Sequence, residues 1–208
     1  MVKQAGMVAA VLPPHHANGM MLSDRRLAPI YAEAQDLGVP VCIHTIGVQI
    51  SPVRTLLEDL VLEDTYGCFP SMLSVGSLMM GGVLDEFPNL TFAVLEVGVG
   101  WVPFIAERLE HNAEFFTAVG NSLKRKPLEY LAEGRFYVAA DPDEPMLAPI
   151  ASFVGDDHIV CGSDYCHPEG MCPYTMRALY ERPDVSTTLK RKILSDNPGR
   201  LYRIAAKN

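Results

Sequence analysis

Two apolar runs of the sequence end in side chains that can bind a metal ion or move a proton. Residues 39–43 run into His44, and residues 158–162 run into Ser163-Asp164, with His167 three residues beyond the aspartate. Neutral imidazole and carboxylate groups are common ligands of zinc and similar divalent ions, and a carboxylate beside such an ion can also handle a proton. A single histidine or aspartate at such a place is often a structural residue that caps a helix or braces a loop. The two runs therefore indicate metal chemistry only if His44 and Asp164 face one shared pocket.

Glu96 is a third candidate of the same kind, because it follows the apolar run 91–95. A buried carboxyl group can hold and release a proton, so Glu96 could act as a proton shuttle. The alternative is a carboxylate that braces the glycine turn at 97–100, whose glycines let the backbone approach a substrate or turn into the following helix. That turn lacks the rest of a phosphate-loop fingerprint, so the sequence does not predict a nucleotide site.

Other arrangements are weaker candidates. His15 and His16 are adjacent, and neighbours in a strand point to opposite faces. They could therefore share an ion only through a turn, which Pro13-Pro14 permits.

His167 could contact a substrate, support a metal ligand or pack in its loop. A soft metal site would need Cys161, Cys166, His167 and Cys172, which contain no Cys-x-x-Cys spacing.

The elements that would position these residues alternate between strands and helices. Five short apolar runs predict strands at 7–12, 39–43, 91–95, 136–140 and 158–162. Helical spacing predicts helices at 52–62, 72–87, 101–116 and 144–154, and an earlier helix that Ser23 caps and Gly38 ends. Ser186 is placed to cap one of the closing helices, and a last turn follows Asn197-Pro198.

Alternation of this kind predicts an α/β fold with a parallel sheet, since each crossover helix returns the chain to the same edge. The runs are apolar throughout, as expected of strands that are covered on both faces. In a (β/α) barrel the carboxyl ends of the strands form the mouth of the active site, where His44, Glu96 and Asp164 would meet. An open doubly wound sheet shares the alternation and also binds ligands at its strand ends, so the pattern alone does not separate the two folds.

The composition is typical of one globular domain over residues 1–208, with 49% hydrophobic and 20% charged residues and no Gly/Ser linker. A net charge of −8 argues against nucleic acid and against an anionic membrane as partners. Five cysteines without framework spacing favour reduced thiols. Because there is no signal-peptide layout and no long apolar run, we expect a cytoplasmic protein.

Four ordered motifs resemble those of the amidohydrolase-related family of metal-dependent hydrolases and decarboxylases, which includes aminocarboxymuconate-semialdehyde decarboxylase. They are Ile43-His44-Thr45, the segment 95–109 with Glu96 and the glycine turn, the helix start Asp143-Glu144, and the segment 162–169. The closing segment 192–202 also resembles the C-terminal helix of the family. The resemblance covers nearly the whole chain. It implies a TIM-type (β/α) barrel, of which this chain would hold about five of eight strand–helix units.

The resemblance also implies a site and a chemistry. His44 and Asp164 match metal-ligand positions of the family, with zinc, or alternatively manganese, as the ion. Asp164 and Glu96 are expected to be catalytic, and His167 and Trp101 are assigned to substrate binding. The expected reaction is hydrolysis, or non-oxidative decarboxylation, of a small aromatic or enol acid.

Two departures from the family pattern define the alternative hypothesis. Nothing matches the family's His-x-His pair on the first strand, and about three strand–helix units expected at the beginning are missing. Truncation, a remainder supplied by another polypeptide and a partial barrel stabilised by oligomerisation all stay open. Since an incomplete barrel exposes sheet edges, we expect a homo-oligomer. The second hypothesis is a catalytically inactive barrel fragment that acts as an assembly or binding module.

Overall fold

The computed structural model describes residues 5–14, 19–44, 65–66, 68–115, 124–167 and 170–204. The helix expected at 52–62 and the His15-His16 pair lie outside these residues.

A five-stranded sheet forms the centre of the described structure. Its strands are β1 (Ala10–Leu12), β2 (Val41–His44), β3 (Phe92–Leu95), β4 (Phe136–Ala140) and β5 (Ile159–Cys161). They lie in the order β1-β2-β3-β4-β5, and each neighbouring pair is parallel. The predicted parallel sheet is confirmed. Because the order never reverses, the sheet has the winding of a barrel wall and lacks the switch point of a doubly wound sheet, which resolves the choice that the sequence left open.

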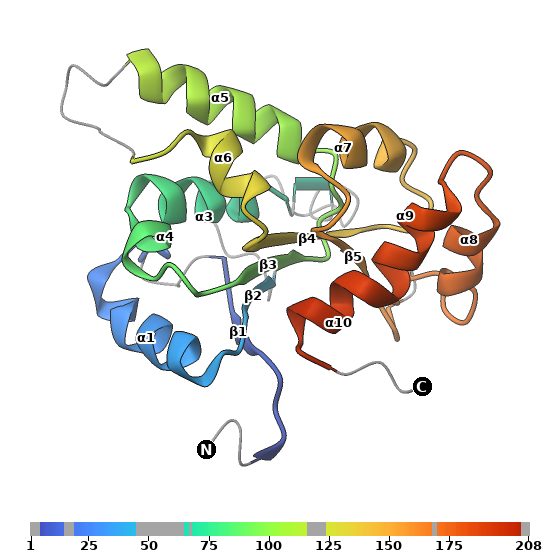
Figure 1. Ribbon diagram of the computed structural model, residues 1–208, viewed down its shortest axis with the longest axis horizontal. Coiled ribbons are helices and arrows are strands. Elements are labelled where there is room, and N and C mark those ends of the chain that lie inside the picture. The colour runs from blue at the N-terminus through green and yellow to red at the C-terminus, as the bar shows by residue number, and fades with distance from the viewer. Residues whose placement is uncertain are drawn as a thin grey trace.

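Helices surround the strands in an arc, from α1 through α3, α6 and α7 to α9 and α10 (Figure 1). Their bounds are α1 Ala28–Leu37, α3 Cys68–Met80, α4 Val83–Glu86, α5 Val102–Phe115, α6 Pro127–Ala132, α7 Leu147–Val154, α8 Thr175–Glu181, α9 Thr187–Arg191 and α10 Asn197–Leu201. The helices predicted at 72–87, 101–116 and 144–154 correspond to α3 with α4, to α5 and to α7. None of the described helices has both the length and the apolar character needed to cross a bilayer.

Alternate residues of each strand pack on opposite sides of the sheet. Val41 and Phe92 belong to the large core beneath the helices. Cys42 and Ala93, on the other face, belong to a smaller cluster that α10 helps to cover. Cover on both sides explains why the strands read as continuous apolar runs. His44 follows Cys42 by two residues, so its side chain projects from the face of the smaller cluster.

Local signals determine where several helices begin and end. Gly38 adopts left-handed backbone with a φ of 64° and donates its N–H to the last turn of α1, as predicted. Ser186 accepts a backbone N–H and caps α9, also as predicted. The prediction for Ser23 is wrong, because Asp24 caps a short 3₁₀ turn ahead of α1 through a 2.9 Å hydrogen bond from the backbone N–H of Arg26.

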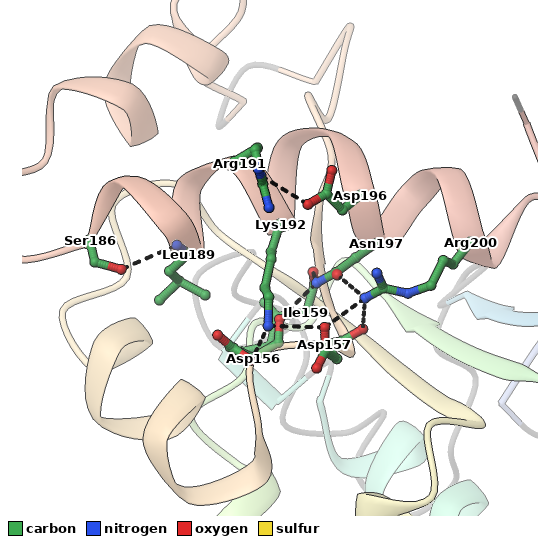
Figure 2. A network of polar contacts seen from close by, with 10 residues as sticks. All are labelled: Asp156, Asp157, Ile159, Ser186, Leu189, Arg191, Lys192, Asp196, Asn197 and Arg200. Atoms are coloured by element: carbon green, nitrogen blue, oxygen red, sulfur yellow. Dashed lines mark hydrogen bonds and ion pairs between the residues drawn. The ribbon is translucent and has the colours of Figure 1, made fainter. Parts of the chain in front are cut away.

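A polar network fastens the C-terminal helices to the turn that precedes β5 (Figure 2). The side chain of Asn197, which is fully buried, donates from Nδ2 to the backbone oxygens of Asp156 (2.9 Å) and Ile159 (2.6 Å). Lys192, in the π-helical segment between α9 and α10, places Nζ 2.7 Å from the Asp156 carboxylate. These contacts fix the amino end of β5, whose opposite end leads to Asp164.

Candidate metal centre at the strand ends

His44 and Glu96 meet at the carboxyl ends of two neighbouring strands. His44 is the last residue of β2 and pairs in register with Leu95, the last residue of β3, so Glu96 comes one step beyond. The Nε2 atom of His44 lies 2.8 Å from Oε2 of Glu96. The two side chains are 31% and 30% exposed, so one side of the pair is open to solvent or to a ligand.

Asp164 and His167 form a second pair in the loop that follows β5. The Oδ1 atom of Asp164 lies 2.8 Å from Nδ1 of His167. The backbone N–H of His167 donates to the carbonyl oxygen of Asp164 at 2.9 Å, so a tight turn keeps the two side chains together. His167 is the more exposed of the two, at 56% against 26%.

The two pairs lie next to each other. Nδ1 of His167 is 3.7 Å from Oε1 of Glu96, so Glu96 contacts His44 with one oxygen and faces His167 with the other. Ligand atoms of Glu96, Asp164 and His167 all lie within 4.8 Å of one another. Two carboxylates and an imidazole are a donor set that suits zinc or manganese. His44 and Asp164 therefore face one mouth, although His44 does not belong to this closest group in the described part of the chain.

Both acidic residues of the group have unusual backbone. Glu96 has a φ of 61° and Asp164 a φ of 48°, in the left-handed region that residues with a side chain rarely occupy. Strict alternation along β3 would point Glu96 to the face opposite His44, and the left-handed conformation turns it back. Such conformations cost roughly 1–3 kcal/mol each and cluster at functional sites.

The glycine turn after β3 is braced by Glu144. Its carboxylate accepts the backbone N–H of Val99 (2.8 Å) and of Gly100 (2.8 Å). Gly98 has a φ of 62°, and a Cβ there would come within 3.0 Å of the Glu144 carboxylate, so this position requires glycine. The bracing role that the sequence left open for Glu96 is thus performed by Glu144. In the sequence, the signal for this role is weak and consists of the pair Asp143-Glu144 shortly after β4.

Trp101 is largely buried, with 8% of its surface exposed. Its indole Nε1 donates to the carbonyl oxygen of Gly98 at 2.9 Å, so the described contact of Trp101 supports the turn. The assignment of Trp101 and His167 to substrate binding stays a prediction.

The mouth carries an excess of negative charge. Glu96, Asp141 and Asp164 follow β3, β4 and β5 in turn, and the loops at 96–101, 141–146 and 162–167 contain no lysine or arginine. Arg182 reaches this end of the sheet, but its guanidinium is engaged by Asp184 (2.5 Å) and by the carbonyl oxygen of Glu144 (2.7 Å). The described loops at this end of the sheet thus place three carboxylates near one another.

Cysteines do not contribute to this group. All five are free thiols. Burial raises the pKa of Cys161 to about 11, which disfavours the thiolate that would bind a metal. The metal-compatible group found among the described residues contains no cysteine, so the soft-metal alternative gains no support.

Comparison with known proteins decides the family. A sequence model of the family described as amidohydrolase matches residues 1–204. The chain belongs to the amidohydrolase family. This confirms the resemblance indicated by the motifs around His44, Glu96 and Asp164.

Relatives of this amidohydrolase chain include decarboxylases. It is 30% identical over 190 residues to a 2-amino-3-carboxymuconate-6-semialdehyde decarboxylase of Dictyostelium discoideum. The aligned region covers 88% of this chain and 50% of the relative. An amidohydrolase structure from Mycobacterium avium subsp. paratuberculosis matches with a TM-score of 0.82 and 25% identity, over 97% of this chain and 53% of the other. A dihydroxybenzoic acid decarboxylase structure from Polaromonas sp. JS666, with bound manganese and the inhibitor 2-nitroresorcinol, matches with a TM-score of 0.77 and 22% identity, over 98% of this chain and 63% of the other.

The chain spans about half the length of the first two of these proteins. Its five parallel strands correspond to part of a TIM-barrel amidohydrolase, as the resemblance implied.

Proposed function

We propose that this chain carries the proton-transfer and metal-binding face of a metal-dependent carboxy-lyase that removes CO₂ from a small aromatic or enol acid. The observation that carries the proposal is the meeting of Glu96, Asp164 and His167 at the strand ends, with ligand atoms within 4.8 Å of one another. The similarity to a decarboxylase at 30% identity favours decarboxylation over hydrolysis within the family.

The charge of the mouth supports a role for a divalent ion. An acid substrate would approach the carboxylates of Glu96, Asp141 and Asp164, and the loops that carry them have no basic side chain. A bound divalent ion would offset this repulsion and act as a Lewis acid towards substrate oxygens. Manganese is the ion of one solved decarboxylase relative, and zinc suits the same donors.

Different residues of this chain would bind the ion and transfer the proton. Asp164 would hold the ion, a role supported by the family resemblance and by its place in the group with Glu96 and His167. The His44–Glu96 pair, joined at 2.8 Å, holds a proton at the mouth and transfers it to the substrate carbon that carries the carboxylate. The bond from that carbon to the carboxylate then breaks, its electron pair returns to the ring or enol system, and CO₂ leaves.

Turnover of a panel of acids tests the proposal. The purified chain is loaded with Mn²⁺ or Zn²⁺ and mixed with dihydroxybenzoic acids and with 2-amino-3-carboxymuconate 6-semialdehyde, and CO₂ release is followed. We expect release with one class of acid, and a loss of about 10²-fold or more in Asp164→Asn. The matched control is His111→Gln, which changes an exposed histidine of α5 outside the site.

Two results would contradict the proposal. One is a metal-loaded chain that releases CO₂ from no acid of the panel, and the other is full activity in Asp164→Asn. The first would favour the non-catalytic assembly or binding module.

A further inference from the structure

We propose that Arg182 is a positioning residue for the proton transfer at the mouth. Arg182 holds the loop after β4, in which Glu144 lies, and Glu144 in turn fixes the glycine turn that follows Glu96. The inference rests on the proposed function, in which Glu96 and His44 carry the proton.

The guanidinium of Arg182 bonds two carbonyl oxygens of the loop after β4. Nη1 donates to the carbonyl oxygen of Pro142 at 3.1 Å and to that of Glu144 at 2.7 Å. Arg182 directly follows α8, so these bonds join segments that are 40 and 38 positions apart in the sequence. The side chain of Arg182 is only 12% exposed, so its loss would leave two carbonyl oxygens without their donor in a place that water reaches poorly.

The direction of the guanidinium is fixed from its other side. Nε and Nη2 of Arg182 lie 3.1 and 2.5 Å from the two carboxylate oxygens of Asp184. The carbonyl oxygen of Arg182 also accepts a bond from Nζ of Lys190, in α9, at 2.5 Å. A planar guanidinium with a bidentate partner on one edge presents its remaining N–H groups in a fixed direction. Arg182 therefore forms a rigid link from the α8–α9 connection to the loop after β4.

The carboxylate of Glu144 continues this link to the glycine turn. Both of its oxygens accept the N–H of Val99, at 2.8 and 3.0 Å, and Oε1 also accepts the N–H of Gly100 at 2.8 Å. Since Arg182 bonds the backbone of Glu144 and the Glu144 carboxylate bonds the turn, a shift of the loop would move the turn with it. The turn begins at Glu96, whose left-handed φ of 61° directs its side chain towards β2.

Hydrogen exchange of the glycine turn tests the link without any substrate. The full chain and its variants are transferred to D₂O, and mass spectrometry follows the fragment that contains the amides of Val99 and Gly100. The variants are Arg182→Ala and Glu144→Ala. The matched control is Arg177→Ala, because Arg177 is an exposed arginine of α8 with an ion pair of its own. A fragment from β4 reports any general loosening of the fold.

We expect the amides of the turn to exchange at least about tenfold faster in Arg182→Ala than in the wild type, with β4 unchanged. Glu144→Ala removes the acceptor itself and should show the same increase, whereas Arg177→Ala should show none. Slow exchange of the turn in Arg182→Ala or in Glu144→Ala, or an increase that extends equally to β4, would overturn the inference.

Arg182→Lys replaces Arg182→Ala if circular dichroism shows that the alanine variant is unfolded. Lysine keeps the positive charge but lacks the planar fork that bonds Asp184 and both carbonyl oxygens together. Faster exchange of the turn is expected in this variant too, and wild-type exchange would overturn the inference.

Steady-state kinetics connect the turn to the proposed function. We expect kcat for CO₂ release to fall about tenfold or more in Arg182→Ala, because the proton carrier is displaced, while KM changes by less than about threefold. Added guanidinium ion should restore part of the lost kcat, and Arg177→Ala should match the wild type. A wild-type kcat in Arg182→Ala would overturn the positioning role and leave the proposed function standing. A wild type that releases CO₂ from no acid would contradict the proposed function, and the exchange rates would still decide whether Arg182 holds the turn.

Discussion

Nε2 of His44 and Oε2 of Glu96 lie 2.8 Å apart although the residues end different strands, with His44 on β2 and Glu96 just past β3. The contact exists because β2 and β3 are in register at His44 and Leu95, and because the left-handed backbone of Glu96 turns its side chain back towards the imidazole. In the proposed function this pair is the proton carrier, and it lies beside Asp164 and His167.

Replacing His44 separates proton transfer from ion binding. In His44→Gln we expect kcat for CO₂ release to fall about 10²–10⁴-fold, because the imidazole that carries the proton is lost. The KM should change much less, since Asp164 and its partners still hold the ion. The measurement is steady-state kinetics at matched metal content. A kcat within threefold of the wild type would show that His44 moves no proton.

Replacing Glu144 tests the brace of the glycine turn. Glu144→Ala leaves the N–H groups of Val99 and Gly100 without their acceptor, and we expect a loss of about 1–3 kcal/mol in the free energy of unfolding. Glu144→Gln keeps one carbonyl oxygen and should lose less. Urea unfolding gives the values, with Glu107→Ala, an exposed position on α5, as the matched control. Equal stability of Glu144→Ala and the control would contradict this role.

Asn197 links α10 to the amino end of β5. Asn197→Asp replaces a donor by a carboxylate that would face the backbone oxygens of Asp156 and Ile159, and the position is fully buried. We expect it to destabilise the chain more than Asn197→Ala, which loses these two hydrogen bonds and the one that Oδ1 accepts from Arg200, at about 1 kcal/mol each. Thermal and urea unfolding of both variants measure the order, and the reverse order would contradict the geometry in Figure 2.

His158 makes stability depend on pH. Burial lowers its pKa below the ordinary value of 6.5, and its Nδ1 has no hydrogen-bond partner among the described residues. The unfolded chain therefore binds this proton more readily than the folded chain. The contribution of His158 is fully present above pH 6.5 and is lost as the pH falls from 6.5 towards the lowered pKa. Unfolding free energies between pH 7.5 and 5.5 should fall less steeply in His158→Gln than in His111→Gln, and equal slopes would rule out His158 as the cause.

Much of the fold could be predicted because its signals are local. The apolar run 136–140 gives β4 with its observed bounds, and the carboxyl ends of β2, β3 and β5 are each predicted to within one residue. Gly38 and Ser186 act on their own helices, so their roles follow from residue type and position. The positions of His44 and Asp164 at strand ends follow from the same runs.

The relations that build the site depend on tertiary structure and could not be predicted. Glu96 takes a left-handed φ without being glycine, because the surrounding structure imposes it. Glu144 reaches Val99 across 45 positions of sequence, a contact that exists only once β3 and β4 are paired. The approach of His167 to Glu96 likewise requires the loop after β5 to fold back towards β3.

The metal content of the purified chain tests the central claim most directly. Chelator-treated protein is incubated with Mn²⁺ or Zn²⁺, freed of unbound ion, and analysed for metal per chain in the wild type and in Asp164→Asn. The strand-end cluster predicts about one ion per chain in the wild type and a loss of most of it in the variant. A wild type that retains no ion, or a variant that retains as much as the wild type, would contradict the account.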